Sequence, residues 1–385
     1  MNEVYLDNNA TTQLDPRVLE AMLPVLASVG NPSSAHAAGQ RARNEIEKAR
    51  HRVAILLRSS PRELVFTSGS TEANNLALQG AARRAPSTRR RIVSVTTEHP
   101  AILKTLEALS ADGFEVVLVG VNTAGMVDLD AMRDAVNDET LLVTVMAANN
   151  ETGVLAPLPA ISDIAHCKGA LMHSDATQLT VWGDVDVDVL GVDLLSISGH
   201  KMHGPQGVGA LYVRREVARP LAAVQHGGGQ ERGLRSGTLN TAGIAGLGVA
   251  AELAALEGPA AGRRVSVLRD DLHRKLADQL PVTLNGHCEK RLPGTLNLAF
   301  SDIEAEAIIA GAPSVAVATG SACSTGDPGP SHVLRAMGID ADQAASSLRF
   351  GLSRFTTQQD VDVAAQLISS SAARVRTATR EAISL

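Results

Sequence analysis

Lys201 is the residue from which a chemical function can first be argued. It follows the polar turn Ser198-Gly199-His200, which comes directly after a predicted strand at 194–198. A lysine at the end of a buried strand is readily desolvated, which lowers its pKa and makes its amine a nucleophile able to form a Schiff base. A single lysine is more often a solvated side chain, so Lys201 needs partners before it indicates a function.

Asp175 is the first such partner, because it follows another predicted strand, at 171–174. An aldehyde cofactor that acts as an electron sink needs a carboxylate against its pyridinium nitrogen. An imine-forming lysine and an aspartate on neighbouring strand ends are the pair that such a cofactor requires. Asp175 is equally compatible with a structural role as a helix N-cap.

Ser70 and Thr71 suggest a phosphate seat. They follow a predicted strand at 64–67 and Gly69, and they open a predicted helix. The first turn of a helix presents unpaired N–H groups and the positive end of the helix dipole. A plain helix cap is the alternative for these two residues taken alone. A phosphate seat, a pyridine partner and an imine-forming lysine together describe pyridoxal phosphate.

The cysteines divide into one candidate nucleophile and two residues without a predicted role. The chain has three cysteines and no CxxC pair, which argues against a disulfide framework or a zinc ribbon. Cys323 lies in a Gly-, Ser- and Pro-rich stretch at 319–331, which favours a loop and not a packed element. Only the thiolate of such a cysteine is a useful nucleophile. We expect Cys167 to be buried filler and Cys288 to be a loop thiol.

Eight ordered motifs carry a family resemblance that runs nearly end to end. They occupy residues 5–12, 67–75, 97–101, 149–153, 175–178, 198–201, 235–238 and 320–323. On these motifs the chain resembles the cysteine desulfurases, a family of fold-type I enzymes in the class V aminotransferase superfamily that depend on pyridoxal phosphate. The length of the stretch around Cys323 resembles the long-loop group, which hands persulfide sulfur to scaffold or carrier proteins.

The resemblance implies a role for each matching residue. Lys201 would be the imine lysine, Asp175 would meet the ring nitrogen, and His99 would stack on the ring and move protons. Cys323 would take the sulfur of L-cysteine as a persulfide. The other implied contacts are Gln178 and Asn150 at the ring hydroxyl and the substrate, Ser70, Thr71, Ser198 and His200 at the phosphate, Thr238 at the phosphate from the other subunit of a homodimer, and Arg349 at the substrate carboxylate. Arg349 could instead form a structural salt bridge.

Other functions stay open at this stage. Selenocysteine lyase and other class V activities share these motifs, although a transaminase has no use for a loop cysteine. A non-catalytic subunit that recruits partners is the alternative of another class, and Lys201, Asp175 and His99 speak against it. We expect no metal in the cofactor site, with Cys323 at most a transient cluster ligand. The acceptor could belong to iron–sulfur assembly, to tRNA or cofactor thiolation, or to DNA sulfur modification, and the C-terminus is shorter than in many iron–sulfur members.

The elements that must position these residues follow from the hydrophobic pattern. Short β-branched runs alternate with helical patterns at 64–67, 91–95, 115–119, 141–146, 171–174, 194–198 and 210–213. Such alternation predicts an α/β fold with a mostly parallel seven-stranded sheet, in which ligands bind at the carboxyl ends of the strands. We expect a large domain at 15–258 and a smaller α+β domain at 1–14 and 259–385. Helices at 241–256 and 263–279 would flank the boundary at Gly258-Pro259.

Composition limits the partners. The chain has 385 residues, 44% of them hydrophobic, and a net charge of −6, which argues against direct nucleic-acid binding. Arg83, Arg84 and residues 89–91 form a basic patch that we interpret as a solvated loop, with a docking site for an acidic partner or nucleic acid as the alternative. The sequence enters a predicted strand at once and has no run of about 18 apolar residues. We therefore expect no signal peptide, no membrane span and a cytoplasmic location.

Overall fold

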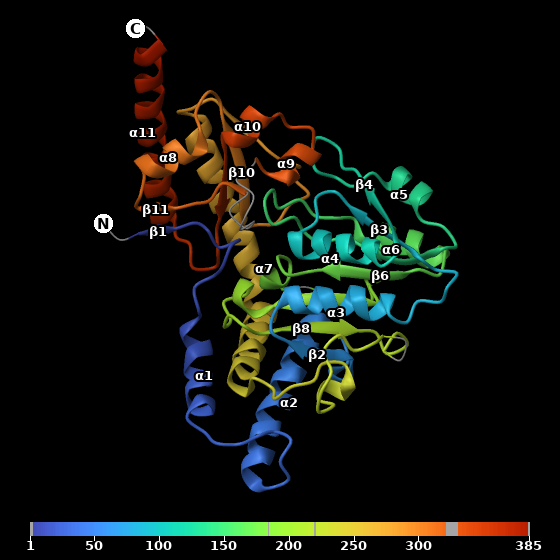
Figure 1. Ribbon diagram of the computed structural model, residues 1–385. Helices are drawn as coiled ribbons and strands as arrows, with labels where there is room; N and C mark the ends of the chain where they lie inside the picture. Colours follow the sequence, from blue (N-terminus) through green and yellow to red (C-terminus); the bar gives the residue numbers. More distant parts are fainter. Residues whose placement is uncertain (1–2, 184, 219–220, 321–329, 384–385) are drawn as a thin grey trace.

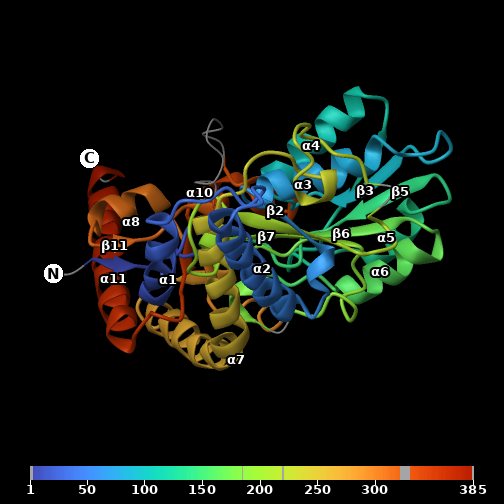
Figure 2. The ribbon, with the colours of Figure 1, turned by 90° about the horizontal axis from the view of Figure 1, so that it is seen from below.

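The computed structural model describes residues 3–183, 185–218, 221–320 and 330–383. A large sheet lies between helices on both of its faces, and a smaller group of strands and helices packs at one end (Figure 1 and Figure 2). The first strand and the last helix both lie in this smaller part, in contact with each other.

The large sheet has seven strands in the order β2-β8-β7-β6-β5-β3-β4. Neighbours are parallel except at β8, which runs antiparallel to β2 and to β7. The strands are β2 Leu64–Thr67, β3 Arg91–Val95, β4 Glu115–Val119, β5 Thr140–Thr144, β6 Leu171–Asp175, β7 Leu194–Ser198 and β8 Gly209–Val213. The predicted α/β fold with a mostly parallel seven-stranded sheet is confirmed, and the predicted strand ends agree within two residues.

Alternate side chains of each strand enter different cores, because successive residues of a strand point to opposite faces. Leu64 and Phe66 pack on one face of the sheet, and Val65 packs on the other. The first face is covered by α2 (Ala37–Leu57), α5 (Leu129–Ala135), α6 (Leu158–Cys167) and the first half of α7, and the second by α3 (Ser70–Ala82) and α4 (Pro100–Ala111). Burial on both faces explains the nearly continuous apolar runs in the sequence.

The smaller part is built around an antiparallel sheet in the order β12-β10-β9 and a parallel pair, β1 with β11. Its apolar core joins Val4 and Leu6 to residues between Val265 and Ala372. The elements are β1 Val4–Tyr5, β9 Val282–Leu284, β10 Thr295–Phe300, β11 Val315–Ala316, β12 Ser347–Gly351, α8 Ala305–Gly311, α9 His332–Ala336, α10 Ala341–Ala345 and α11 Gln358–Ile383. The N-terminal chain leaves this core, bonds to the turn after β7 through the N–H groups of Thr12 and Asp15, and enters α1 (Pro16–Leu26).

One long helix replaces the two helices expected around Gly258-Pro259. Helix α7 runs from Thr241 to Ala277 without a break and extends through both parts of the molecule (Figure 1). Gly258 is buried so closely against Trp182 that a Cβ there would collide with the Trp182 backbone. This tertiary packing overrides the local helix-breaking tendency of Gly and Pro.

Helix α7 contributes to both cores. Leu247 and Ala254 pack in the core of the large sheet, whereas Val265 and Leu272 pack in the core of the smaller part. The expected domain boundary at 258/259 therefore falls inside a continuous helix, and the division into domains stays a prediction. By length and composition alone α7 could cross a membrane, but more than half of its most apolar window is buried in the protein. This burial is the pattern of a core helix.

Candidate active site

A cavity of about 290 Å³ lies at the carboxyl ends of the strands, where the sequence predicted a site. Its walls come from the loops after β2, β3, β5, β6 and β7 and from the N-terminal segment. The lining residues are Ala10, Ser70, Thr71, His99, Met146, Ala148, Asn150, Asp175, Thr177, Gln178, His200 and Lys201. Eight of the predicted site residues are therefore brought together by the fold.

Lys201 reaches the cavity from a short turn, Gly199–Lys201, directly after β7. Its Nζ donates hydrogen bonds to the carbonyl oxygens of Asn9 and Ala10, the latter at 2.7 Å. The Gln178 amide also donates to the Asn9 carbonyl, at 3.0 Å. The N-terminal segment thus closes one side of the cavity and supplies two neutral acceptors for the lysine.

Asp175 is held rigidly at the end of β6. Its side chain is 8% exposed, and its two carboxylate oxygens accept from the Asn74 side chain at 2.7 Å and from the Thr177 N–H at 3.0 Å. The second contact is a local turn. Asp175 is not a helix N-cap, because it ends β6 and the next element is the short 3-10 helix Thr180–Trp182, whose N-cap is Leu179. Beneath Asp175, His173 is fully buried between hydroxyl groups, and desolvation lowers its pKa to about 4. The ring beneath Asp175 is therefore neutral at pH 7.

His99 forms another wall of the cavity and caps α4. Its Nδ1 accepts a hydrogen bond from the Ala101 N–H at 3.1 Å. Burial lowers the pKa of His99, so the ring is neutral at pH 7, with the remaining proton on Nε2. A neutral imidazole with a fixed tautomer can stack on an aromatic ring and exchange a proton through Nε2.

The first turn of α3 forms an open anion seat beside the cavity. Gly69 precedes the helix with a positive φ of 152°, and no side chain caps the helix N-terminus. A second hollow adjoins the cavity here and shares Ala10, Ser70, Thr71 and His200 with it, with Ser198 on its wall. His200 bonds Thr11 through Nδ1 at 3.1 Å, and burial lowers its pKa to about 4. Hydroxyls, a neutral imidazole and free helix N–H groups suit a phosphate.

Comparison with known proteins agrees with this arrangement. The model of the family described as Aminotransferase class-V matches residues 4–363. A cysteine desulfurase IscS from Anaeromyxobacter sp. (strain Fw109-5) is 48% identical, with 97% of this chain and 93% of the relative aligned. The chain belongs to this family. Its members depend on pyridoxal phosphate, and a cysteine desulfurase from Rattus norvegicus is 44% identical over 95% of this chain and 82% of its own.

Solved structures of the family share the whole fold. A NifS-like protein superposes with a TM-score of 0.89 at 38% identity and covers 96% of this chain and 98% of its own. A structure described as SspA in complex with cysteine superposes with a TM-score of 0.82 at 33% identity, over 92% of this chain and 99% of its own. The resemblance drawn from the eight motifs is confirmed.

Three residues expected from the family pattern lie outside both hollows or outside the described residues. Cys323 is in the stretch 321–329, which the structure does not describe. Thr238 is exposed and lines neither hollow. Arg349 is fully buried on β12, where it forms the salt bridge that was the alternative to a substrate contact, with Asp7 at 2.8 Å. It also donates to the carbonyl of Asn150, a cavity residue, at 3.2 Å.

Sequence reasoning missed residues that support the cavity from behind. Asn74 is fully buried and orients Asp175, yet in the sequence it stands one position from Asn75, which does not. Glu98 is fully buried next to His99, and burial raises the pKa of its carboxyl to about 8. No pattern in the sequence distinguishes such a carboxyl from a surface one.

Cys167, expected to be buried, is exposed because it is the last residue of α6.

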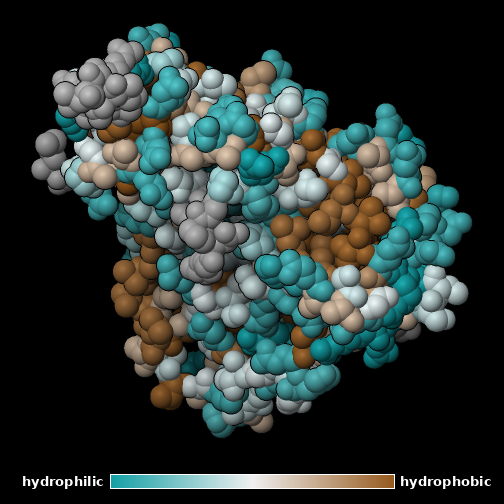
Figure 3. All heavy atoms as spheres, turned by 45° about the horizontal axis from the view of Figure 1, so that its top comes forward, coloured by the Kyte–Doolittle hydropathy of each residue, from teal (hydrophilic) through white to brown (hydrophobic). Residues whose placement is uncertain are grey.

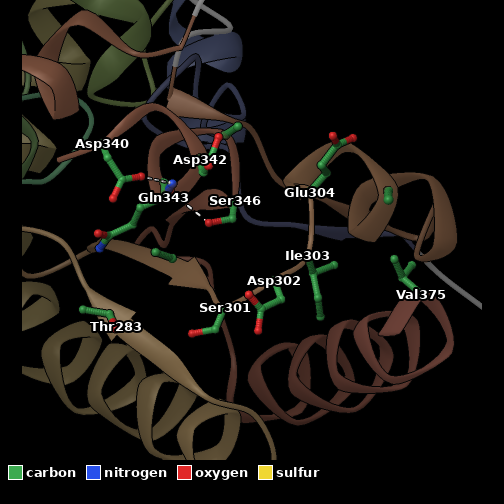
Figure 4. Close-up of a pocket in the computed structure, with 13 residues that line it drawn as sticks. Thr283, Ser301, Asp302, Ile303, Glu304, Asp340, Asp342, Gln343, Ser346 and Val375 are labelled. Carbon is green, nitrogen blue, oxygen red and sulfur yellow. Dashed lines mark hydrogen bonds between the residues drawn. The ribbon is translucent and has the colours of Figure 1, made fainter. Parts of the chain in front are cut away.

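Among the described residues, a further hollow lies away from the predicted site residues. A cavity of about 840 Å³ in the smaller part is lined by acidic side chains, among them Asp302, Glu304 and Asp340 (Figure 4). In the described parts of the chain, no three His, Cys, Asp or Glu side chains are grouped so that they could hold a metal ion.

The basic patch has structural partners. Arg91 pairs with Glu115 at 2.8 Å, Arg90 stacks over the Phe114 ring, and Arg89 donates to the Thr140 carbonyl. These contacts tie residues 89–91 to the sheet, so this part of the patch is partly buried and is not the solvated loop that we expected.

Proposed function

We propose that this protein binds pyridoxal phosphate and acts as a cysteine desulfurase, converting L-cysteine to L-alanine and leaving a persulfide on Cys323. The observation that carries the proposal is the cavity that joins Lys201, Asp175 and His99 in a chain 48% identical to a cysteine desulfurase. The match to a structure solved with cysteine supports the choice of amino acid.

The residues present fit the cofactor. Lys201 is the amine that would hold its aldehyde, and Asp175 is a buried, fixed carboxylate for the ring nitrogen. The Thr177 hydroxyl lines the cavity and is buried without a hydrogen-bond partner in the structure, which a bound polar group would supply. The seat at the start of α3 would take the phosphate. When bound, the cofactor supplies an electron sink that stabilises a carbanion at Cα.

The chain's own groups would then move the protons. The Lys201 amine lines the cavity and would be the base that takes the Cα proton. His99, neutral and protonated on Nε2, is placed to return a proton as general acid. Asn150 and Gln178 line the cavity and would reach the ring hydroxyl and the substrate. Arg349 would serve the substrate carboxylate either directly, by exchanging Asp7 for the substrate, or by holding Asn150.

The sulfur step needs no outside oxidant. The Cys323 thiolate attacks the sulfur of the bound L-cysteine, so that a new S–S bond forms as the Cβ–S bond breaks. The electron pair of the broken bond stays on carbon and is protonated there. The products are L-alanine and a persulfide on Cys323, and the atoms and electrons of the two thiols account for both.

Replacement of Cys323 by serine tests the proposal. Cys323→Ser protein should fold, keep the yellow colour of bound cofactor and form no persulfide with L-cysteine, because only the thiol accepts sulfur. Persulfide and L-alanine would be measured after incubation with L-cysteine. Cys167→Ser and Cys288→Ser are the matched controls, since both thiols are exposed, and both should behave as the unmodified protein. Alanine and labile sulfur at the normal rate from Cys323→Ser would disprove the role of Cys323.

The same assay separates the alternatives. A selenocysteine lyase would prefer L-selenocysteine to L-cysteine by a wide margin in kcat/KM, and a non-catalytic subunit would bind no cofactor and release no alanine.

We further propose that the enzyme is a cytoplasmic homodimer, that Thr238 completes the phosphate seat of the partner subunit, and that the persulfide passes to a scaffold or carrier protein. The exposed position of Thr238 on the single chain is compatible with a role in the partner's site.

A further inference from the structure

Glu151 is a buried carboxyl that the proposed reaction does not use. It lies in the turn after β5, next to the cavity residue Asn150, and it is 3% exposed. The Asn149 side chain fixes this turn by accepting from the N–H groups of Glu151 and Thr152, both at 2.9 Å. Asn150 and Glu151 therefore share one rigid turn, so a group held by Glu151 is also held in register with the cavity.

Glu151 contacts both ends of the chain segment that contains Cys323. On the C-terminal side, the Ser331 hydroxyl donates to Glu151 Oε2 at 2.5 Å. On the N-terminal side, Gly320 packs against the same carboxyl so closely that a Cβ at Gly320 would collide with Oε2. One carboxylate oxygen thus meets residue 320 and residue 331. Desolvation of Glu151 raises its pKa, while Ser331, His332 and Arg349 lower it.

Two further contacts tie the same segment ends to site residues. Ala318 pairs with Arg349 through backbone hydrogen bonds in both directions, the shorter at 2.7 Å from the Arg349 N–H. His332 Nε2 donates to the carbonyl oxygen of Glu98 at 2.9 Å, directly before His99. The ends of the segment are therefore attached to the strand of Arg349, to the turn of Asn150 and to the turn of His99.

Chain length makes the position of Gly320 important. In the sequence only three residues of chain separate Cys323 from Gly320, and an extended chain spans at most about 3.6 Å per residue. A thiol close in sequence to a fixed anchor can reach only a small volume around that anchor. A shift of the anchor moves this volume away from the substrate sulfur. A misplacement of about 1 Å can cost about 100-fold in rate.

We propose that Glu151, together with Ser331, is a positioning element that holds the two ends of the Cys323 segment in register with the cavity and so sets the rate of sulfur capture. The inference rests on the proposed function and deepens it. Neither residue touches the cavity of the cofactor, so both act through Cys323. Loss of their contact should slow persulfide formation and leave the binding of L-cysteine unchanged.

Three substitutions at Ser331 test this, because the hydroxyl also caps α9 by accepting from the Leu334 N–H at 3.2 Å. Ser331→Ala removes both contacts. Ser331→Asp keeps a capping oxygen but cannot donate to a carboxylate, and Ser331→Thr keeps both contacts. Asp340→Ala is the matched control, since it removes only the N-cap of the neighbouring helix α10. The measurements on cofactor-loaded protein are the single-turnover rate of persulfide formation on Cys323, the cofactor absorbance change on titration with L-cysteine, and the melting temperature.

The expected result is a persulfide rate about 10- to 100-fold lower in Ser331→Ala and Ser331→Asp, with an unchanged titration midpoint. Ser331→Thr and Asp340→Ala should stay near the unmodified rate. A normal rate in Ser331→Asp would overturn the proposal, since the cap alone would then suffice, and so would a slow rate in Ser331→Thr. If the unmodified protein itself forms no persulfide from L-cysteine, the proposed function fails, which is a different outcome.

Discussion

Glu98 shows how the fold sets the chemistry of a single residue. Its carboxyl is fully buried, Oε1 accepts from the Met146 N–H, and Oε2 is buried without a hydrogen-bond partner in the structure. Burial, followed by repulsion from Asp175, raises its pKa from 4.5 to about 8. The carboxyl is therefore protonated at neutral pH, and it adds no second negative charge beside Asp175 in the cavity wall.

Protonation of Glu98 predicts a pH dependence of stability. The folded protein keeps the proton up to about pH 8, whereas the unfolded chain loses it near 4.5, so Glu98 lowers the free energy of unfolding as pH rises between these values. The slope is at most about 1.4 kcal/mol per pH unit. Glu98→Gln should lack this component, and urea denaturation of both proteins from pH 5 to pH 8 should show their difference shifting in favour of the variant. Glu107→Gln, at an exposed site on α4, is the control. A constant difference would contradict the buried, protonated state.

At the scale of elements, the strand ends could be predicted from the local sequence, whereas the unbroken course of α7 could not. The strands end where the pattern predicts, because a short apolar, β-branched run followed by polar residues is a local property of the sequence. Helix α7 continues through Gly258 and Pro259 because the turn at Trp182 and Gly183 packs on it. The packing is so close that a Cβ added to Gly183 would lie 2.6 Å from the Ala254 carbonyl oxygen. This packing joins the two cores into one structure.

The close approach at Gly258 predicts the effect of a methyl group there. Gly258→Ala should lower the free energy of unfolding by about 1–3 kcal/mol, because the added Cβ would overlap the Trp182 backbone. Gly262→Ala, one turn along α7, should lower the free energy of unfolding by less. The added Cβ would lie 3.3 Å from its nearest neighbour, a Pro293 side-chain atom, and alanine is favoured over glycine in a helix by about 1 kcal/mol. Chemical denaturation of the three proteins measures both. Equal effects would show that the approach to Trp182 is relaxed in solution.

At the scale of the whole molecule, α1 leaves an apolar stripe uncovered. Leu19, Leu23 and Leu26 lie at helical spacing and are 44%, 55% and 61% exposed, and apolar atoms gather over this helix at the lower left of Figure 3. A contiguous apolar stripe on a surface helix indicates a contact with another chain. The stripe supports the proposed homodimer, as does the exposure of Thr238.

Shared sites in a homodimer predict complementation between inactive subunits. Lys201→Ala should abolish desulfurase activity, and Thr238→Ala should weaken cofactor retention. When the two variants are unfolded together and refolded, each mixed dimer would contain one site with both an intact Lys201 and an intact Thr238 from the partner subunit. Activity in the mixture should therefore exceed the sum of the two separate variants. Purely additive activity, or a monomer in analytical ultracentrifugation, would rule out the shared site.

The sequence by itself determined the α/β class and the strand positions, and it indicated Lys201, Asp175 and His99 as site residues. The order of strand-like and helical runs and the spacing of motifs are properties of neighbouring residues. Only the tertiary structure decided which groups meet across the chain: Arg349 with Asp7, Lys201 with the carbonyls of residues 9 and 10, and Glu151 with both ends of the Cys323 segment. The tertiary structure also decided the raised pKa of Glu98 and the unbroken helix at Gly258. Desolvation and close packing depend on atoms contributed by distant parts of the chain, and no local pattern records them.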